Sequence, residues 1–247
     1  VMIKKEGIAL ERLDKLLAST GRWSRKEAKD LVRLGRVLAD GSPVRGPEER
    51  YDPGAVCLTV DGEAVDCSPF VYVMLHNPAG LLSATEDKRQ PTVLDLLPPE
   101  LRRRGLFPAG RLDKDTTGLL LLTDDGDLSH RLLSPKKHVD KVYLARVEGR
   151  IDTEDVKALA EGMVLKDGLR CLPAVLEPLE DGSECRITLR EGKYHQVKRM
   201  LAARGKPVLT LHRLSMGSLT LDQALKPGQW RFLSTFERGQ LGEDRQA

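Results

Sequence analysis

Two aspartates stand before a strongly apolar run in the segment GRLDKDTTGLLLLTDDGDL, residues 110–128. Arg111 and Asp113 flank Leu112, so in extended backbone their side chains point to one side while Leu112 packs inward. A nearby cation keeps a carboxylate ionised, and an ionised aspartate can act as a nucleophile. The segment is therefore compatible with a reactive carboxylate held at the edge of a packed sheet.

Two other interpretations of this segment stay open on the residues alone. A structural salt bridge beside a surface turn, TDDGDL, would account for the acids without any chemistry. The other interpretation is a calcium loop. Pro108 and Gly110 argue against it, because they stand where the helix that precedes such a loop should be. Such a loop, of the EF-hand type, would use Asp113, Asp115, Thr117, Gly118 and Asp124.

The composition is that of a soluble protein with a sizeable core. The chain has 247 residues, of which 40% are hydrophobic and 31% charged. It lacks both a run of about 18 apolar residues that would cross a membrane and a signal-peptide pattern, which predicts a cytoplasmic protein. The four cysteines and five histidines are too scattered for a zinc site. We therefore expect no metal, and reduced, mostly packed thiols.

The elements that must position these residues alternate irregularly along the chain after residue 68. Strand-like runs are FVYVML, LLLL at 119–122, KVYLARVEG and CRITLREG, and helical segments are DTEDVKALAEGM and YHQVKRMLAARG. Because strands and helices do not alternate regularly, we expect an α+β domain over residues 68–240. Its sheet should be mixed, mostly antiparallel and flanked by helices. Residues 241–247 are expected to form a polar, frayed C-terminal tail.

The N-terminal part differs from the rest in its charge. Residues 1–36 contain ten Lys and Arg against five Asp and Glu. Helical spacing predicts one helix in LERLDKLLAST, residues 10–20, and a second that begins with a capping box formed by Ser24 and Glu27. Ala28, Leu31 and Val32 should be its buried stripe. The outer face then carries a basic stripe of Arg25, Lys29 and Arg33.

The stretch RLDKLLASTGRWSRKEAKDLVRLGRVLADGSPV resembles the S4 RNA-binding domain over nearly its whole length. The resemblance implies a small α/β module over residues 1–67, with a linker near Cys67-Ser68-Pro69, that holds structured ribosomal RNA through phosphate contacts. The expected contacts are Arg12, Lys15, Arg25, Lys26, Lys29 and Arg33.

The opening segment is similar to the signature of pseudouridine synthases of the RsuA class. Further matches stand in the right order: HNPAGLLSAT before it, then SHRLLSPKKHVDKVYLARVEG, EGKYHQVKRML and LHRLSMGSLTLD after it. The Tyr-His-Gln-Val-Lys form of the third motif is most like members that act on small-subunit ribosomal RNA. One departure is Asn77, which stands where the family usually has a lysine.

The resemblance implies the roles of individual residues. Asp113 would be the essential carboxylate, acting either by addition to the sugar or by deprotonation at C2′, and Lys198 its basic partner. Tyr143 would stack on the extruded uracil, and Arg111 would fill the vacated space or hold a phosphate. Further residues of the substrate cleft would be Thr116, His195, Gln196 and Arg199. No cofactor is expected, because the isomerisation involves neither redox chemistry nor hydrolysis.

Bland alternatives remain for each residue and for the whole chain. Lys198 could be an exposed base, Tyr143 a core residue, and Arg111 a permanent partner of Asp115, while His195 could be a neutral ring bonded to backbone. The chain as a whole could be a non-catalytic ribosome-assembly factor, or could modify a large-subunit site. The expected partner is ribosomal RNA, free or in a small-subunit assembly intermediate, bound by a monomer.

Overall fold

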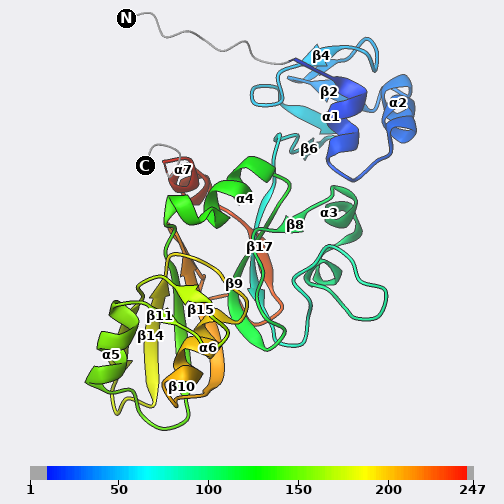
Figure 1. The fold of residues 1–247 in the computed structure, drawn as a ribbon. Helices are drawn as coiled ribbons and strands as arrows, with labels where there is room; N and C mark the ends of the chain where they lie inside the picture. Colours follow the sequence, from blue (N-terminus) through cyan, green and yellow to red (C-terminus); the bar gives the residue numbers. More distant parts are fainter. Residues whose placement is uncertain (1–9, 244–247) are drawn as a thin grey trace, which may run out of the picture. The chain divides into compact units, whose positions relative to one another are not determined.

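The computed structural model describes residues 10–243, which group into two compact units. The first unit extends to Val71 and also includes Leu97–Leu106. The second consists of Tyr72–Leu96 and the residues from Phe107 onward (Figure 1). The expected linker at Cys67-Ser68-Pro69 lies just before this boundary. In the described residues, no helix is long and apolar enough to span a membrane.

The first unit packs two helices on a small antiparallel sheet. Leucines of α1 and the stripe of Ala28, Leu31 and Val32 are buried in one core with residues of the sheet, as the helical spacing predicted. The elements are β1 (Glu11–Arg12), α1 (Leu13–Ser19), α2 (Arg25–Arg33), β2 (Val37–Ala39), β3 (Ser42–Pro43), β4 (Arg50–Tyr51), β5 (Leu58–Val60), β6 (Glu63–Val65) and α3 (Pro99–Arg103), with sheet order β3-β2-β5-β6.

Local signals explain how these helices begin and end. The capping box of α2 is confirmed: the Ser24 hydroxyl accepts from the Glu27 amide at 3.2 Å, and the Glu27 carboxylate accepts from the Ser24 amide at 2.7 Å. The first helix begins at Leu13, three residues later than expected, because Glu11 and Arg12 pair with β4. Gly21 has a φ of +74°, and a Cβ there would lie 2.0 Å from the Glu100 carbonyl oxygen, so only glycine fits between the two segments.

The second unit is built on one mixed sheet with the order β13-β14-β10-β15-β9-β7-β17. Only the pairing of β15 with β9 is parallel, which confirms the mostly antiparallel prediction. In β14, Cys185, Ile187 and Leu189 are buried, as their alternation predicted. The strands are β7 (Tyr72–Asn77), β8 (Phe107–Pro108), β9 (Thr116–Thr123), β10 (Lys141–Val147), β13 (Val175–Leu179), β14 (Glu184–Leu189), β15 (Val208–Met216), β16 (Leu219–Thr220) and β17 (Trp230–Phe232), with a separate pair β11 (Met163–Val164) and β12 (Arg170–Cys171).

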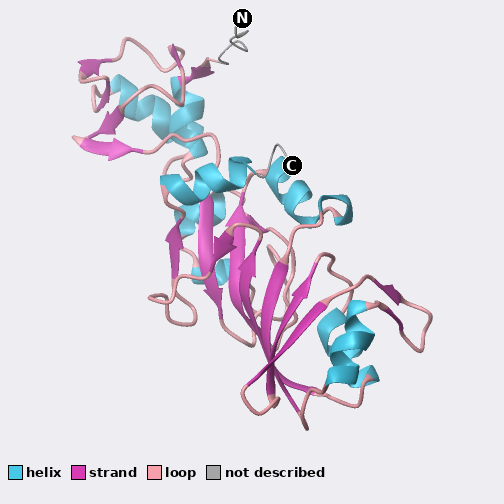
Figure 2. Ribbon diagram, turned by 90° about the vertical axis from the view of Figure 1, so that its left-hand side faces the viewer, coloured by secondary structure: helices cyan, strands magenta, loops and turns pink. Residues whose placement is uncertain are grey.

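Helices cover this sheet, as the ribbon of Figure 2 shows. Side chains of α4 (Gly126–Leu133) and α7 (Thr235–Glu243) share one core with Leu119 and Leu121 of β9. At the β13 edge of the sheet, α5 (Thr153–Ala160) contacts β13, and in its middle α6 (Gln196–Ala203) contacts β15. Short 3-10 helices, η1 and η2, span Val93–Leu96 and Pro135–Lys137.

Two expectations about the ends of elements need correction. The acids of TDDGDL do not form a free turn, because Asp125 caps α4 by accepting from the Leu128 amide at 2.8 Å. The expected polar tail begins as helix: α7 runs to Glu243, and Leu241 is only 2% exposed. The last residues of the tail, 244–247, lie outside the described residues. The thiol prediction is confirmed, since all four cysteines are free and only Cys57 is exposed.

Candidate active site

One cleft of the second unit collects most of the residues that the sequence singled out. The cleft lies between the segment before β9, the strands β10 and β15, and the start of α6. Six predicted site residues line it: Arg111, Asp113, Thr116, Tyr143, His195 and Gln196. Residues from positions 111 to 211 therefore meet at one surface, which is what a built site requires and a surface turn does not.

The backbone before β9 is held in place on both sides of Asp113. The Leu112 amide donates to the Ser83 hydroxyl at 3.0 Å, and this hydroxyl lies 3.2 Å from the Leu112 carbonyl oxygen. The Thr116 amide then donates to the Asp113 carbonyl oxygen at 2.9 Å. Leu112 is buried while Arg111 is exposed, as predicted, and the Asp113 side chain keeps 27% of its surface exposed.

The strand that follows contradicts the calcium loop. Thr117 and Gly118 lie within β9, which runs extended from Thr116 to Thr123, so they do not wrap around a loop centre. Gly118 has a φ of +103°, and a Cβ there would lie 2.3 Å from the Arg213 carbonyl oxygen. This glycine is needed for the close approach of β9 and β15, not for a metal.

Lys198 links the two acids of the opening segment. Its Nζ lies 3.0 Å from Asp113 Oδ2 and also bonds Asp115 Oδ1. Burial lowers the pKa of Lys198, but the hydrogen bonds to Asp115 and Asp113 outweigh burial, so that the pKa is raised overall. The hydrogen bond from Lys198 in turn lowers the pKa of Asp115. The exposed-base interpretation of Lys198 is therefore wrong.

Arg111 does not form the salt bridge with Asp115 that the structural alternative predicted. The Asp115 carboxylate pairs with Lys198 instead. Among the described residues, Arg111 forms no ion pair, and its exposed side chain lines the cleft. A free guanidinium at the rim of a cleft is available to bind an anion.

His195 contributes from the residue before α6. It adopts the left-handed conformation, with a φ of +50°, and its Nε2 lies 3.5 Å from Asp113 Oδ1. Its ring stacks on that of Tyr194, with centroids 3.8 Å apart. The expectation of a ring bonded to backbone is therefore corrected, because the ring faces the carboxylate.

Tyr143 and Thr116 form the buried part of the cleft lining. Tyr143 lies on β10, is 9% exposed, and pairs across the sheet with Ile187 and Arg213, so it is at once a core and a cleft residue. Thr116 is 1% exposed, and its hydroxyl has no hydrogen-bond partner among the described residues. A buried hydroxyl without a partner is costly unless a ligand or water satisfies it.

Gln196 is held by a polar loop that the sequence reasoning missed. Its Nε2 donates to Glu191 Oε1 at 2.6 Å, and its Oε1 accepts from the Lys193 amide at 3.0 Å. Burial raises the pKa of Glu191, but hydrogen bonds from Lys193, Leu172 and Gln196 lower it by more. The pKa is therefore lowered overall. Gln196 therefore positions the wall formed by Glu191 and Lys193. The adjacent letters EGK directly before Tyr194 were the available signal.

The remaining predicted residues lie outside this cleft. Arg199 pairs with Asp167 at 2.5 Å and does not line the cleft. In the first unit, Arg12, Arg25 and Lys29 converge on Asp14, at 3.0, 3.5 and 3.9 Å. Asp14 is 1% exposed, and the hydrogen bond from Arg12 lowers its pKa. The basic stripe is thus partly organised by a buried acid that no sequence pattern indicated.

Two further bases of the first unit have acidic neighbours. Lys15 pairs with Glu11 at 2.7 Å, and Arg33 with Asp30 at 3.3 Å. Lys26 is exposed and has no ion pair within the described part of the chain. Exposed pairs of this kind exchange readily for phosphate contacts, because they are worth little in water.

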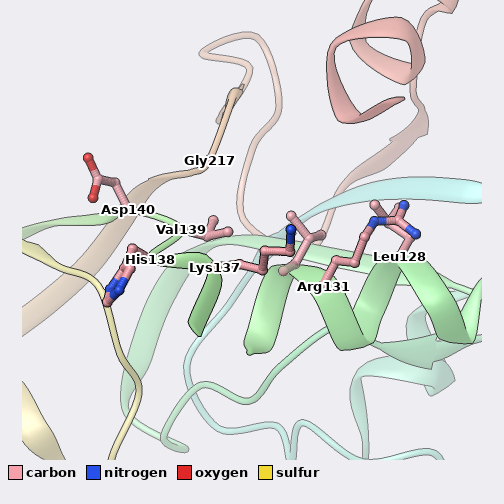
Figure 3. A pocket seen from close by; sticks show the side chains of 8 residues that line it. Leu128, Arg131, Lys137, His138, Val139, Asp140 and Gly217 are labelled. Carbon is pink, nitrogen blue, oxygen red and sulfur yellow. The ribbon is translucent and has the colours of Figure 1, made fainter. Parts of the chain in front are cut away.

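A second hollow of the same unit carries none of the predicted residues. It lies along α4 and η2 and is lined by Leu128, Arg131, Leu132, Lys137, His138, Val139, Asp140 and Gly217 (Figure 3). The carboxylate here, Asp140, is paired with Arg190 at 2.8 Å. The first cleft, by contrast, combines the Asp113 carboxylate with the Lys198 ammonium group and the buried Tyr143 ring, so we take it as the candidate active site.

Comparison with known proteins agrees with this geometry. The family model described as RNA pseudouridylate synthase matches residues 71–203, and the S4 domain model matches residues 11–57. An uncharacterized RNA pseudouridine synthase of Bacillus subtilis is 51% identical, covering 94% of this chain and 98% of the relative. The ribosomal small subunit pseudouridine synthase A of Pseudomonas aeruginosa is 46% identical, over 92% and 98%, and that of Escherichia coli 40% identical, over 92% and 97%.

A solved structure agrees with the sequence relatives. The crystal structure of a pseudouridylate synthase superimposes with a TM-score of 0.66 at 37% identity, covering 93% of this chain and 99% of that one. The fold, the order of the motifs and the two matching models point the same way. The chain belongs to the RNA pseudouridylate synthase family and carries an S4 domain ahead of its catalytic fold.

Proposed function

We propose that this protein converts one uridine of small-subunit ribosomal RNA to pseudouridine, with Asp113 as the essential carboxylate. The observation that carries the proposal is the placement of Asp113 in a cleft, 3.0 Å from Lys198 and beside the buried Tyr143 ring. The choice of substrate is supported by the relatives named small subunit pseudouridine synthases.

The reaction is an isomerisation in which every atom of the nucleotide is kept. The bond between N1 and C1′ breaks, the base rotates, and a bond between C5 and C1′ forms. The proton on C5 leaves, and N1 gains a proton. Asp113 either adds to C1′ as N1 leaves and is displaced when C5 attacks, or removes the proton from C2′ to give a glycal and returns it when the C5–C1′ bond forms. Both routes need its carboxylate ionised.

The neighbours of Asp113 suit this chemistry. Lys198 places a positive charge 3.0 Å from Asp113 Oδ2, and its pairing with Asp115 holds the ammonium group in place. Tyr143 offers a ring face to the uracil and a hydroxyl for proton transfer. Thr116 offers a hydroxyl that has no hydrogen-bond partner among the described residues.

The rest of the machinery holds the RNA. Extruding a uridine from folded RNA costs a few kcal/mol of stacking, which the bound state must offset. Arg111 is free to enter the vacated space or to bind a phosphate, and the bases of the S4 domain hold the backbone. We propose a monomer that acts in the cytoplasm, on free RNA or on a small-subunit assembly intermediate.

The deciding experiment is carbodiimide mapping of pseudouridine on both ribosomal RNAs from cells lacking the gene. The cells are then restored with wild type, Asp113→Asn or Asp140→Asn. Asp140 is a matched control, because it is also paired with a cation, Arg190, but does not line the cleft. We expect one small-subunit modification to return with wild type and Asp140→Asn, and not with Asp113→Asn.

Other outcomes would change the proposal in defined ways. A large-subunit modification would keep the chemistry and correct the substrate. No modification at any position would favour a non-catalytic assembly factor. Repeating the reaction in vitro on naked RNA and on assembly intermediates would then identify the form of RNA that the enzyme accepts.

A further inference from the structure

Tyr194 presents a large exposed aromatic ring beside the cleft. Its surface is 75% exposed, in a chain of which only 4% is aromatic. The ring lies nearly parallel to that of His195, with centroids 3.8 Å apart and planes 18° apart. One face of the tyrosine is therefore covered by the histidine, and the opposite face remains open.

The ring pair connects this open face with the proposed reacting group. His195 lines the cleft and lies 3.5 Å from Asp113, whereas Tyr194 is not part of the lining. Tyr194 is thus one ring-width outside the place where the uridine would react. An open aromatic face at this position suits a nucleobase, since every base can stack on it regardless of its hydrogen-bonding edge.

We propose that Tyr194 stacks on the nucleobase next to the uridine that enters the cleft. The inference rests on the proposed function. A uridine that leaves its helix takes away a stacking partner from both neighbours, and the Tyr194 ring replaces one of them. His195 supports the ring from behind. Tyr194 then selects and positions the RNA without taking part in bond making.

The test is a binding cycle between protein and RNA. The RNA is a short hairpin around the mapped uridine, either intact or with one flanking base removed to leave an abasic nucleotide, and the protein carries Asp113→Asn so that no reaction occurs. Tyr194→Leu should weaken binding of the intact hairpin about 5- to 150-fold. Tyr194→Phe should bind normally, as should Phe236→Leu, a matched control because Phe236 is 73% exposed and does not line the cleft.

The abasic hairpin distinguishes stacking from other roles. Removing the correct flanking base should weaken binding by a similar factor when Tyr194 is present, and not at all with Tyr194→Leu. Independent effects of the two changes, at both flanking positions, would overturn the proposal. If Tyr194 only supports His195, Tyr194→Leu in the active enzyme would lower kcat and leave KM unchanged. A wild-type enzyme that makes no pseudouridine would refute the proposed function, whereas pseudouridine formation without coupling would refute only the stacking.

Discussion

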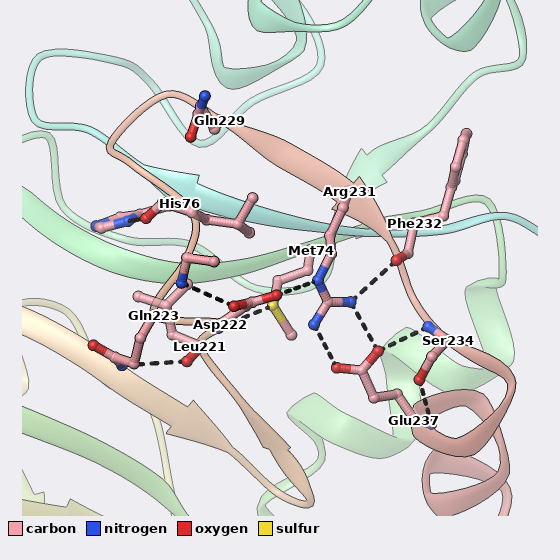
Figure 4. A network of polar contacts seen from close by, with 12 residues as sticks. Met74, His76, Leu221, Asp222, Gln223, Gln229, Arg231, Phe232, Ser234 and Glu237 are labelled. Atoms are coloured by element: carbon pink, nitrogen blue, oxygen red, sulfur yellow. Dashed lines mark hydrogen bonds and ion pairs between the residues drawn. The ribbon is translucent and has the colours of Figure 1, made fainter.

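Among the described residues of the second unit, one cation lies between two carboxylates in several places, and two of these places use the arrangement differently. In the cleft, Lys198 lies between Asp113 and Asp115. Near the C-terminal helix, Arg231 lies between Asp222, at 2.7 Å, and Glu237, at 2.8 Å (Figure 4).

The arginine cluster is held by many hydrogen bonds. Arg231 donates to Asp222, to both oxygens of Glu237 and to the Phe232 carbonyl oxygen, while Glu237 also accepts from the Ser234 amide. The hydrogen bond from Arg231 is the main reason that the pKa of Glu237 falls to about 2. These bonds join β17 to α7 and use four of the five guanidinium N–H groups of Arg231.

The lysine cluster is left open by contrast. An ammonium group is a point charge and cannot clamp a carboxylate through two parallel bonds. Asp113 lines a cleft, and among the described residues its carboxylate has Lys198 and His195 as close neighbours. The comparison teaches that a guanidinium bonded to two elements at once forms a structural ion cluster, whereas the carboxylate beside Lys198 still faces a cleft.

The strongest test of this contrast exchanges one carboxylate in each cluster for its amide. Asp113→Asn should lower pseudouridine formation about 1,000-fold or more, because the reacting group is lost, while RNA affinity stays within about threefold. Asp222→Asn should leave formation near the wild-type rate and lower the melting temperature. Single-turnover assays with labelled RNA and thermal unfolding measure both effects. Loss of RNA binding in Asp113→Asn would assign Asp113 a structural role instead.

The next largest effect concerns stability and pH. Glu237→Gln should lower the free energy of unfolding at pH 7 by about 1–3 kcal/mol, the usual worth of hydrogen bonds to a charged group. Because the folded-state pKa of Glu237 lies below its ordinary value of 4.5, its contribution is complete above about pH 4.5 and is lost as the pH falls toward 2. Urea unfolding at several pH values should therefore show a smaller acid-induced loss for the variant than for wild type. Equal acid slopes for the two proteins would contradict this account of the cluster.

The sequence predicted those parts of this comparison that depend on short-range patterns. The alternation of Cys185, Ile187 and Leu189 identified β14, and the Ser24–Glu27 spacing identified the start of α2. The place of Asp113 and Lys198 came from motif resemblance, since their contact joins segments 85 positions apart, and no local rule carries that information.

The failures have physical causes of the same kind. The segment TDDGDL was predicted to be a turn but contains the start of α4. An aspartate in a turn after a strand and an aspartate that caps a helix look alike in sequence. The buried Asp14 was missed because two of its three partners, Arg25 and Lys29, come near it only when α1 packs against α2. Glu191 was missed because it lies in the loop before α6. Its position in the cleft depends on the hydrogen bond from Gln196, the first residue of that helix.

A smaller effect is expected where the basic residues of the first unit are changed. Arg25→Ala with Lys29→Ala should weaken RNA binding and reduce the salt slope of log K by about 1.5, if each residue neutralises one phosphate. The fold should persist, because Arg12 still holds Asp14 through two hydrogen bonds. Lys157→Ala is the matched control, since Lys157 is an exposed helix lysine paired only with Glu154 among the described residues. An unchanged salt slope in the double variant would remove this stripe from the RNA-binding surface.

The smallest effects should come from exchanging the two cations, and they test the contrast most directly. Lys198→Arg keeps the charge beside Asp113, so pseudouridine formation should stay within about tenfold of wild type, reduced because a guanidinium can hold the carboxylate through two bonds and compete with substrate. Arg231→Lys should leave formation unchanged and lower stability by about 1–2 kcal/mol, because one ammonium group cannot replace the four bonds that Arg231 makes. Rate measurements and urea unfolding of both variants supply the comparison. A Lys198→Arg enzyme as fast as wild type, together with an Arg231→Lys protein as stable, would mean that only charge matters in both clusters, and the geometric distinction between them would be wrong.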